Sequence, residues 1–325
     1  MLLTLTRPLL HRANSFTPKG IEIAVILALL FSASPAQGQT SKSPETSVYP
    51  DSLNKAKLAT VLTTEAVFYT AGMSYLGFIW YKDHERVPFH WYNDSKGYLQ
   101  VDKFGHAFGA YVESYVSYDW LRRSGLSRNK SLIIGGLTGA FLQFPIEVFD
   151  GLYEGWGFSM SDVAANTTGS ALVVMNELLF QRQLIKYKFS FRQSSYAKQS
   201  NGYLGSSQLE SLFYDYNGHT YWLSIPINSM VFKESIPGWI ALSLGYSANG
   251  MFGEFSNLTS YGGVALPEVE RHRQMLLSID IDPSAINTRF KALNTVLDHL
   301  FWIKIPAPTL EYNPIDGLKF HPVYW

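Results

Sequence analysis

Residues Leu58 to Tyr81 read LATVLTTEAVFYTAGMSYLGFIWY and contain a single charged side chain, Glu65. The stretch is longer than the roughly 20 apolar residues that a helix needs to cross a bilayer. Three further helices are predicted over residues 102–123, 130–150 and 161–180. Gly105 and Gly109 lie four residues apart, a spacing of small residues that lets helix backbones approach closely in membranes. We therefore expect a small four-helix membrane-associated bundle, with a soluble bundle of amphipathic helices as the alternative.

The pattern changes after about residue 190 to polar turns and strands of period two. Apolar residues alternate over 223–227, 240–246 and 275–281, as in half-buried strands. Residues 284–300 have the spacing of an amphipathic helix that Ser284 is placed to cap. Prolines near the C-terminus predict an extended tail. The predicted fold class is mainly α, namely the bundle followed by a smaller β-rich C-terminal region with one amphipathic helix.

The N-terminal segment has the features of a signal peptide. Basic residues precede an apolar run over 21–33, and Ala36 and Gly38 suit a signal peptidase. The apolar run is shorter than the roughly 20 residues of a spanning helix, so cleavage is favoured over the alternative of an uncleaved anchor. The predicted organisation is a signal peptide over 1–38, a linker over 39–54, a helical membrane-associated domain over 55–188 and the β-rich region over 189–325. Lysine plus arginine equals aspartate plus glutamate at 26 each, so the overall charge does not favour a nucleic-acid partner.

The basic residues are segregated along the predicted bundle. If the four helices alternate in direction, Lys55, Lys57, Arg128 and Lys130 fall at one end and most acids at the other. After export, this orientation would oppose the positive-inside preference of inner-membrane proteins. Either the chain is not inserted in the inner membrane by the usual route, or the number of predicted helices is wrong by one. We therefore expect a cell-envelope protein associated with a membrane, on the outer-membrane or periplasmic side rather than in the inner membrane. The expected partners are membrane lipid and other envelope proteins, and the oligomeric state is not predicted.

Polar residues along the predicted helices form the candidate site. Asp102 and His106 lie at i and i+4, so they share a helix face, and Glu113 lies two turns further along it. An acid beside a histidine can orient the ring of a general base or of a metal ligand. A capping aspartate and a hydrogen-bonded core histidine would give the same pattern. We take Asp102 and His106 as candidate catalytic residues and Glu113 as a candidate binding residue.

A second group of polar residues lies on the third and fourth predicted helices. Glu147 is embedded among apolar residues one turn before Asp150, and Pro145 is expected to kink the helix before them. Ser159 or Ser161 can cap the next helix, which places Asp162 in its first turn and Asn166 one turn on. We take Glu147 as a catalytic candidate, Ser159 and Asn166 as binding candidates, and Asp150 and Asp162 as candidate ligands should a divalent metal bind. The sequence requires no cofactor.

These motifs resemble two families. Asp102-Lys103-x-x-His106, a glutamate near the end of a small-residue helix, and Ser159-x-x-Asp162-x-x-x-Asn166 are similar to VanZ-like membrane proteins. Over about residues 55–190 the chain more closely resembles the YfiM-like predicted periplasmic lipoprotein family (domain of unknown function 2279). That resemblance implies an envelope location and no established activity. The chain departs from both families, because it has no cysteine for a lipid anchor and has Asp150 near the place where VanZ-like proteins often have a glutamine.

Three functions remain open from the sequence. The first is a non-enzymatic envelope protein whose polar cluster stabilises helix crossings or binds a lipid headgroup or a partner. The second is a membrane enzyme acting on a lipid-linked envelope substrate, with His106 as base or metal ligand. The third is proton-coupled transport, for which four helices make a thin pathway.

Overall fold

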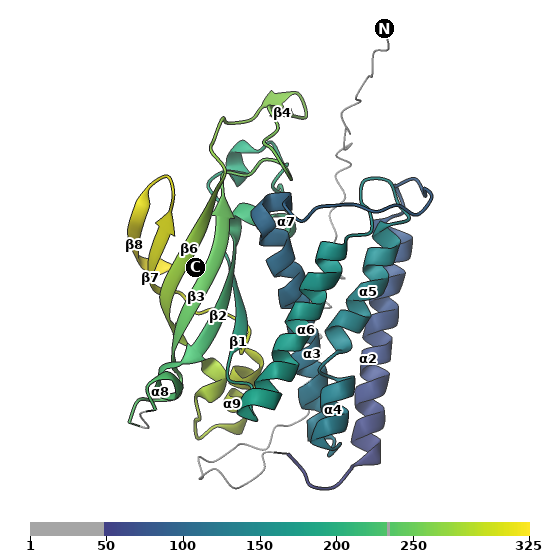
Figure 1. Cartoon of the computed structure of the whole chain (residues 1–325), viewed down its shortest axis with the longest axis vertical. Helices are drawn as coiled ribbons and strands as arrows, with labels where there is room; N and C mark the ends of the chain where they lie inside the picture. Colours follow the sequence, from purple (N-terminus) through teal and green to yellow (C-terminus); the bar gives the residue numbers. More distant parts are fainter. Residues whose placement is uncertain (1–48, 233–234) are drawn as a thin grey trace.

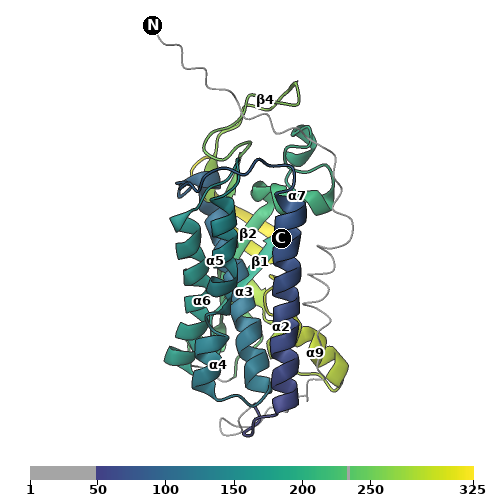
Figure 2. The ribbon, with the colours of Figure 1, turned by 90° about the vertical axis from the view of Figure 1, so that its right-hand side faces the viewer.

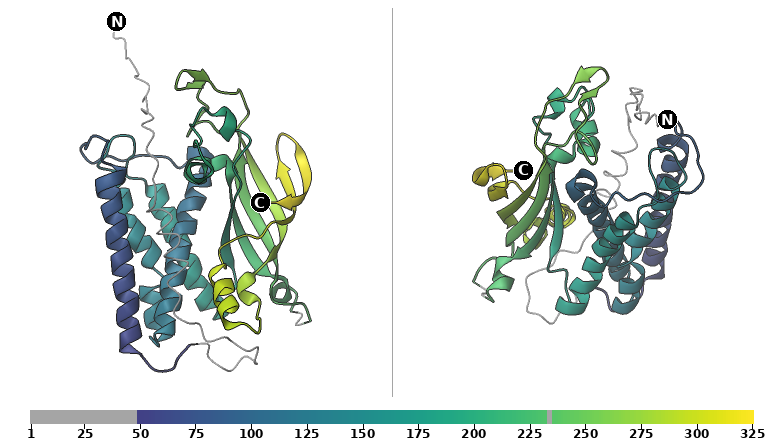
Figure 3. Two further views of the ribbon diagram at one scale, coloured as in Figure 1. Left: turned by 180° about the vertical axis from the view of Figure 1, so that it is seen from behind. Right: turned by 45° about the horizontal axis from the view of Figure 1, so that its top comes forward.

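The computed structural model describes residues 49–232 and 235–325, which form two layers (Figure 1). Helices occupy one layer, and a six-stranded antiparallel sheet forms the other. The helical layer comprises α2 (Lys55–Tyr75) with a π-helical turn (Leu76–Trp80), α3 (Val101–Arg123), α4 (Arg128–Ile134), α5 (Thr138–Asp150) and α6 (Met160–Phe180). Figure 2 looks onto this layer, and Figure 3 shows α2 at its outer side, away from the sheet. The predicted signal peptide, residues 1–38, and most of the linker lie outside the described residues.

The helices begin and break for local reasons. The Asn54 side chain accepts a hydrogen bond from Lys57 N at 3.0 Å and so caps α2. The expected single helix over 130–150 is divided into α4 and α5. At the division, a Cβ on Gly135 would lie 2.5 Å from the backbone nitrogen of Tyr118 in α3. Pro145 lies inside α5, so the interruption follows this close approach rather than the proline.

Small residues bring α5 and α6 against α3. A Cβ on Gly169 would lie 1.9 Å from the carbonyl oxygen of Ala107, and one on Gly139 would lie 2.1 Å from that of Ala110. Only glycine allows backbones to pack this closely. Close backbone packing of small residues is therefore present at Gly139 and Gly169, whereas Gly105 and Gly109 face the side chains of Tyr221 and Gln143.

The main sheet has the strand order β1-β2-β3-β6-β7-β8. Its strands are β1 (Lys186–Phe191), β2 (His219–Pro226), β3 (Ile240–Asn249), β6 (His272–Ile281), β7 (Ala307–Asn313) and β8 (Gly317–Tyr324), and β4 (Ser260–Tyr261) and β5 (Val264–Ala265) form a separate hairpin. The segment before β7 returns to the free edge of β1, where Phe189 N donates to Trp302 O at 2.9 Å and Lys304 N donates to Phe189 O at 3.0 Å. The sheet therefore curls so that the segment just before β7 lies alongside β1.

Short helices lie at the ends of the sheet: α7 (Gln208–Tyr214), α8 (Ile227–Met230) and α9 (Lys291–His299). The amphipathic helix expected over 284–300 is shorter than predicted. Ser284 belongs to a 3-10 turn before it and hydrogen bonds to Asp282 rather than capping α9.

The core between the layers is aromatic. Phe104 of α3 stacks on Tyr246 of β3 with ring centroids 4.4 Å apart, and Phe108 lies 5.9 Å from the ring of Tyr221. The Tyr187 hydroxyl of β1 donates to Phe104 O at 2.9 Å. Because α3 contacts both the sheet and the other helices, it is the central element of the fold.

The opposite face of the curled sheet encloses polar side chains. Lys188 and Asp280 have 0% side-chain exposure and form an ion pair of 2.7 Å. Ser224 and Ser243 donate to Asp280 at 2.6 and 3.0 Å, which satisfies the buried carboxylate. Exposed positions on the same strands are apolar, as shown by Leu244 on β3 and by Met275, Leu277 and Ile279 on β6. The sheet is therefore polar inside and apolar outside.

Two sequence predictions need correction. The fold is not mainly α with a four-helix bundle: it is mixed, because β7 and β8 extend the sheet and α3 packs on that sheet as well as on other helices. Among the described residues, the segment that meets the length and composition of a membrane-crossing helix is Arg128–Asp150, with 28% of its most apolar window buried. The expected span over 58–81 does not meet them, since threonines, tyrosines and Glu65 dilute its apolar residues.

Candidate functional site

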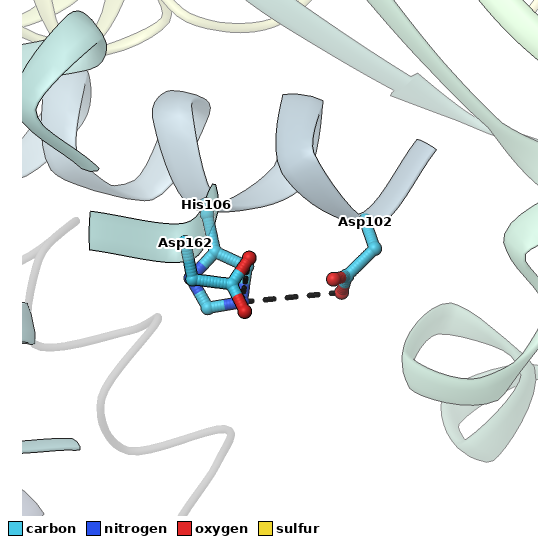
Figure 4. Close-up of side chains that lie close together, drawn as sticks. All are labelled: Asp102, His106 and Asp162. Carbon is cyan, nitrogen blue, oxygen red and sulfur yellow. Dashed lines mark ion pairs between the residues drawn. The ribbon is translucent and has the colours of Figure 1, made fainter. Parts of the chain in front are cut away.

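The candidate site lies at the upper end of the helical layer in Figure 1, where α3 and α6 begin and α5 ends. Figure 4 shows Asp102 and His106 projecting from α3 and Asp162 approaching them from α6. The loop before α3 adds Asp94, and the end of α5 adds Glu147. Segments distant in sequence therefore converge on one polar cluster.

An unusual backbone turn sets the start of α3. Residues 98–100 have φ angles of 44°, 51° and 69°, a left-handed conformation that costs roughly 1–2 kcal/mol for each residue with a side chain. The sheet layer holds this turn in place: the Tyr246 hydroxyl donates to the carbonyl of residue 99, and Arg273 Nη2 donates to Gln100 Oε1 at 2.7 Å. The sheet thus fixes where α3 starts and where Asp102 lies.

Lys103 is the central cation of the cluster. Its Nζ lies 2.7 Å from Asp94 Oδ2 and 2.9 Å from Asp102 Oδ2, and it also donates to Asp162 Oδ1. Burial lowers the pKa of Lys103, but Asp102 and Asp162 outweigh burial and hold that pKa above its ordinary value. Lys103 is therefore protonated and balances one of the three carboxylates it contacts.

His106 lies among the carboxylates at longer distances. Its Nε2 is 3.6 Å from Asp162 Oδ1 and 3.9 Å from Asp102 Oδ1, and its Nδ1 is 3.5 Å from Glu147 Oε1. These separations are at or beyond the limit of a hydrogen bond, so the ring is positioned between acids without a short bond to any of them. Its side chain is 25% exposed, more than the side chains of Lys103 and of the four carboxylates Asp94, Asp102, Glu147 and Asp162.

Glu147 and Asn166 form the buried floor of the site. Each is 1% exposed, and Asn166 Nδ2 donates to Glu147 Oε1 at 3.2 Å. Glu147 Oε2 and Asn166 Oδ1 are both buried without a hydrogen-bond partner. Burial, reinforced by the charges of Asp162 and Asp150, raises the pKa of Glu147 to about 9. Glu147 is thus a neutral acid at pH 7, with one proton to donate.

The remaining acids differ in protonation behaviour. Burial raises the pKa of Asp162 to about 6, with His106 opposing and Asp102 reinforcing the rise. Burial also raises the pKa of Asp150 to about 6, although the Tyr81 hydroxyl donates to this carboxylate. For Asp94, burial is outweighed by hydrogen bonds from Lys103 and two serines, and its pKa falls to about 2. The cluster therefore holds acids whose pKa values lie on both sides of neutrality.

The carboxylates and histidine suit a metal only in part. Ligand atoms of Asp102, His106 and Asp162 lie within 4.8 Å of one another, a donor set that a divalent metal can use. However, the Asp162 oxygen that faces His106 already accepts from Lys103. Asp150, the other expected ligand, lies outside this trio. The ammonium of Lys103 thus already supplies positive charge at an oxygen that a metal bound by this trio would share.

Two of the predicted binding residues have other contacts. Glu113 lies further down α3, where it accepts from Gln143 Nε2 at 3.1 Å, and burial raises its pKa to about 7. Ser159 caps α6 by accepting from the backbone nitrogen of Asp162 at 3.1 Å and also donates to Asp94 at 2.6 Å. The structure brings together the other candidates: Asp102, His106, Glu147, Asp150, Asp162 and Asn166.

The sequence analysis assigned no role in the site to several members of the cluster: Lys103, Asp94, Tyr81, Ser161 and Tyr216. The Tyr216 hydroxyl donates to Asp102 Oδ1 at 3.0 Å across the two layers. Lys103 follows Asp102 directly in the sequence, so its place in the cluster could have been predicted from this pair. Asp94 lies in a loop and Tyr216 in the sheet layer, and no periodicity links either of them to α3.

Comparisons with known proteins give one finding. A family model described as a predicted periplasmic lipoprotein (DUF2279) matches residues 90–178. This segment includes every cluster residue from Asp94 to Asn166. No curated protein and no solved structure matches the chain, and the similarity to VanZ-like proteins is not shown. The family match supports an envelope-associated protein of unknown activity on the periplasmic side, although a chain without cysteine cannot carry a lipid on that residue.

Proposed function

We propose that the chain is a non-enzymatic, membrane-associated protein of the cell envelope that contacts lipid hydrocarbon through the outer face of its helical layer. The observation that supports this most directly is the exposed surface of α4 and α5. Every exposed position over residues 131–150 is a large apolar residue: Ile133, Ile134, Leu137, Phe141 and Phe144. Helices that face water carry charges at such positions. An apolar patch of this kind marks a lipid or protein contact.

The neighbouring helices continue this face. No exposed residue of α2 and its π turn beyond Lys57 is charged, and Leu62, Val67, Phe78 and Ile79 are exposed there. Glu65, the acid in this stretch, is half-buried. On α6 the exposed positions are also uncharged and end in Leu178, Leu179 and Phe180.

The polar side chains of these helices lie between them. Ser114 donates to Ser170 at 2.9 Å, and both hydroxyls accept from backbone nitrogens of α5. Polar contacts between closely packed helices, with apolar residues outside, are typical of helices in lipid. In this proposal the Lys103 cluster fixes how α3, α5 and α6 cross.

A lysine placed on the face tests the proposal. Phe141 is 76% exposed in the first turn of α5, and Phe141→Lys exchanges a favourable lipid contact for a charge at a cost of about 3 kcal/mol. Binding to phosphatidylcholine vesicles, measured by flotation, should fall by up to about 100-fold.

Val264→Lys is the matched control, because Val264 is exposed on the β4–β5 hairpin, away from the helical face. This variant should bind vesicles as the unchanged chain does. Equal binding by all three proteins, with equal melting temperatures, would contradict a lipid contact through this face.

A second candidate function is proton-transfer catalysis on an envelope substrate. It is favoured by one observation, the unpartnered Glu147 Oε2 and Asn166 Oδ1 beside the partly exposed His106. A neutral carboxylic acid next to an imidazole can act as general acid and base. In this function Glu147 is the acid, His106 is the base, and Asp102 orients the ring.

The two functions differ in their response to His106→Ala. If the protein is an enzyme, this variant should lose its envelope phenotype while keeping its abundance and melting temperature. If the cluster only fixes the helices, the phenotype should follow stability alone, and His106→Ala with normal stability should complement a deletion strain.

A further inference from the structure

The end of the molecule opposite the Lys103 cluster collects positive charge. In Figure 1 this lower end contains the start of α2, together with α4, α8 and α9. Six exposed cations from separate segments lie here: Lys55, Lys57, Lys130, Arg182, Arg289 and Lys291. Arg182 Nη2 donates to Ser229 Oγ of α8 at 3.0 Å, which ties the helical layer to the sheet layer at this end. We name these six residues the basic end.

The acids nearby leave this charge largely unbalanced. Asp119 bonds to Arg123 at 2.5 Å, and Glu177 lies 3.3 Å from Arg128. Asp282 is buried and bonds to Lys186 at 2.6 Å. Asp298 is half-buried and Asp51 is exposed. Among the described residues, the acids at this end are therefore mostly committed to other cations, and the basic end has a net positive charge.

Apolar side chains project beside these cations. Met230, Val231 and Phe232 are exposed where α8 ends, and Phe232 is 92% exposed. Phe290, Leu293 and Val296 are exposed on and before α9. Basic residues mixed with exposed apolar residues form the pattern of surfaces that bind anionic lipids, since the apolar groups enter the bilayer and the cations meet its phosphates. A nucleic acid would match the cations but not the apolar groups.

We propose that the basic end binds the phosphates of anionic lipids. The inference rests on the proposed lipid contact and deepens it by naming the lipid class. The exposed face of α4 and α5 begins directly beyond Lys130, so cations at the phosphates would leave that face against hydrocarbon. Each basic residue near an anionic surface contributes about fivefold to binding.

The experiment compares two double variants on two kinds of vesicle. Lys130→Gln with Lys291→Gln removes one cation from each layer. Lys96→Gln with Lys198→Gln removes two exposed lysines from the opposite end and serves as the control. Binding to phosphatidylcholine vesicles, and to vesicles with about a third phosphatidylglycerol, is measured by flotation at low salt. Circular dichroism and melting temperature confirm folding.

The unchanged chain should prefer the anionic vesicles. The first double variant should bind them about 25-fold more weakly, with unchanged binding to phosphatidylcholine, and the control pair should lose much less. Equal binding of the unchanged chain to both vesicles, or equal losses in the two double variants, would overturn the inference and leave the proposed lipid contact standing. If the unchanged chain bound neither kind of vesicle, the result would contradict both the proposed lipid contact and the inference about anionic lipids.

Discussion

Replacing Glu147 by glutamine should make the folded protein less sensitive to pH. Glu147 is 1% exposed, and burial raises its pKa from 4.5 to about 9. Because the folded state holds this proton more tightly than the unfolded state, the stability that it contributes is complete below about pH 4.5. That stability is lost as the pH rises through the folded-state pKa.

The magnitude follows from the two pKa values. Each pKa unit corresponds to 1.36 kcal/mol, so the full loss is about 6 kcal/mol, and about 4 kcal/mol of it falls between pH 5 and pH 8. Glu147→Gln keeps the shape of the protonated acid and cannot ionise. The variant should therefore lose less stability over this interval than the unchanged chain, while Asp150 and Asp162 titrate in both.

The assay is urea unfolding of the purified chain in mild detergent, followed by tryptophan fluorescence at pH 5, 6, 7 and 8. Glu154→Gln provides the control, because Glu154 is an exposed carboxyl shortly beyond the same helix. The free energy of unfolding of this control should follow that of the unchanged chain. If the free energy of unfolding changed with pH in the same way for Glu147→Gln and the unchanged chain, the conclusion that Glu147 is a neutral acid in the folded state would be refuted.

Two further predictions concern stability. Lys103→Met should lower the free energy of unfolding by about 3–5 kcal/mol, because Asp94, Asp102 and Asp162 would lose their shared cation. Lys103→Arg should lower it less. Equal urea midpoints for Lys103→Met and the unchanged chain would contradict this role of Lys103. Gly169→Ala should destabilise by about 1–3 kcal/mol or more, since its Cβ would lie 1.9 Å from the carbonyl oxygen of Ala107. Gly72→Ala is the control, because nothing lies within 4 Å of a Cβ at this position, and it should stabilise the protein by up to about 1 kcal/mol. A higher melting temperature for Gly169→Ala than for Gly72→Ala would show that the packing of α6 on α3 does not depend on the close approach of Gly169 to Ala107.

The helices were predictable because their pattern is strong and local. The expected helix over 102–123 corresponds to α3, Val101–Arg123, and the one over 161–180 corresponds to α6, Met160–Phe180. The fold class was not predictable in the same way. Prolines indicated an extended tail, but this segment forms the paired strands β7 and β8. Pro308 is tolerated there because the register of the two strands shifts between Ala307 and Thr309, and a missing backbone N–H is accepted at such an irregularity.

The direction of the sheet faces was also hidden in the sequence. Alternation over 240–246 and 275–281 indicates that two faces differ, without showing which face is buried. In the structure the polar residues Ser243 and Ser278 are buried, and the apolar residues Leu244 and Leu277 are exposed. Pairing across the curled sheet decides this arrangement, and no local pattern contains it.

The part of the candidate site that could be predicted from the sequence consists of residues that share a helix face. Asp102 and His106 share a face of α3, and Asp162 and Asn166 share one of α6. The role of Lys103 depends on a loop that brings Asp94 to it and on a turn fixed by the sheet layer. Such contacts arise from tertiary structure, so the charge balance of the cluster could not be worked out beforehand.

Site-directed spin labelling tests the lipid contact most directly. The chain has no cysteine, so Phe141→Cys and Val264→Cys each create a single attachment site for a nitroxide. The accessibility of each label to oxygen and to a water-soluble nickel complex is then measured by electron paramagnetic resonance with the protein bound to vesicles. The label at Phe141 should be accessible to oxygen and protected from nickel, and the label at Val264 should show the reverse. Equal accessibility of both labels to nickel would mean that the apolar helical face does not contact lipid.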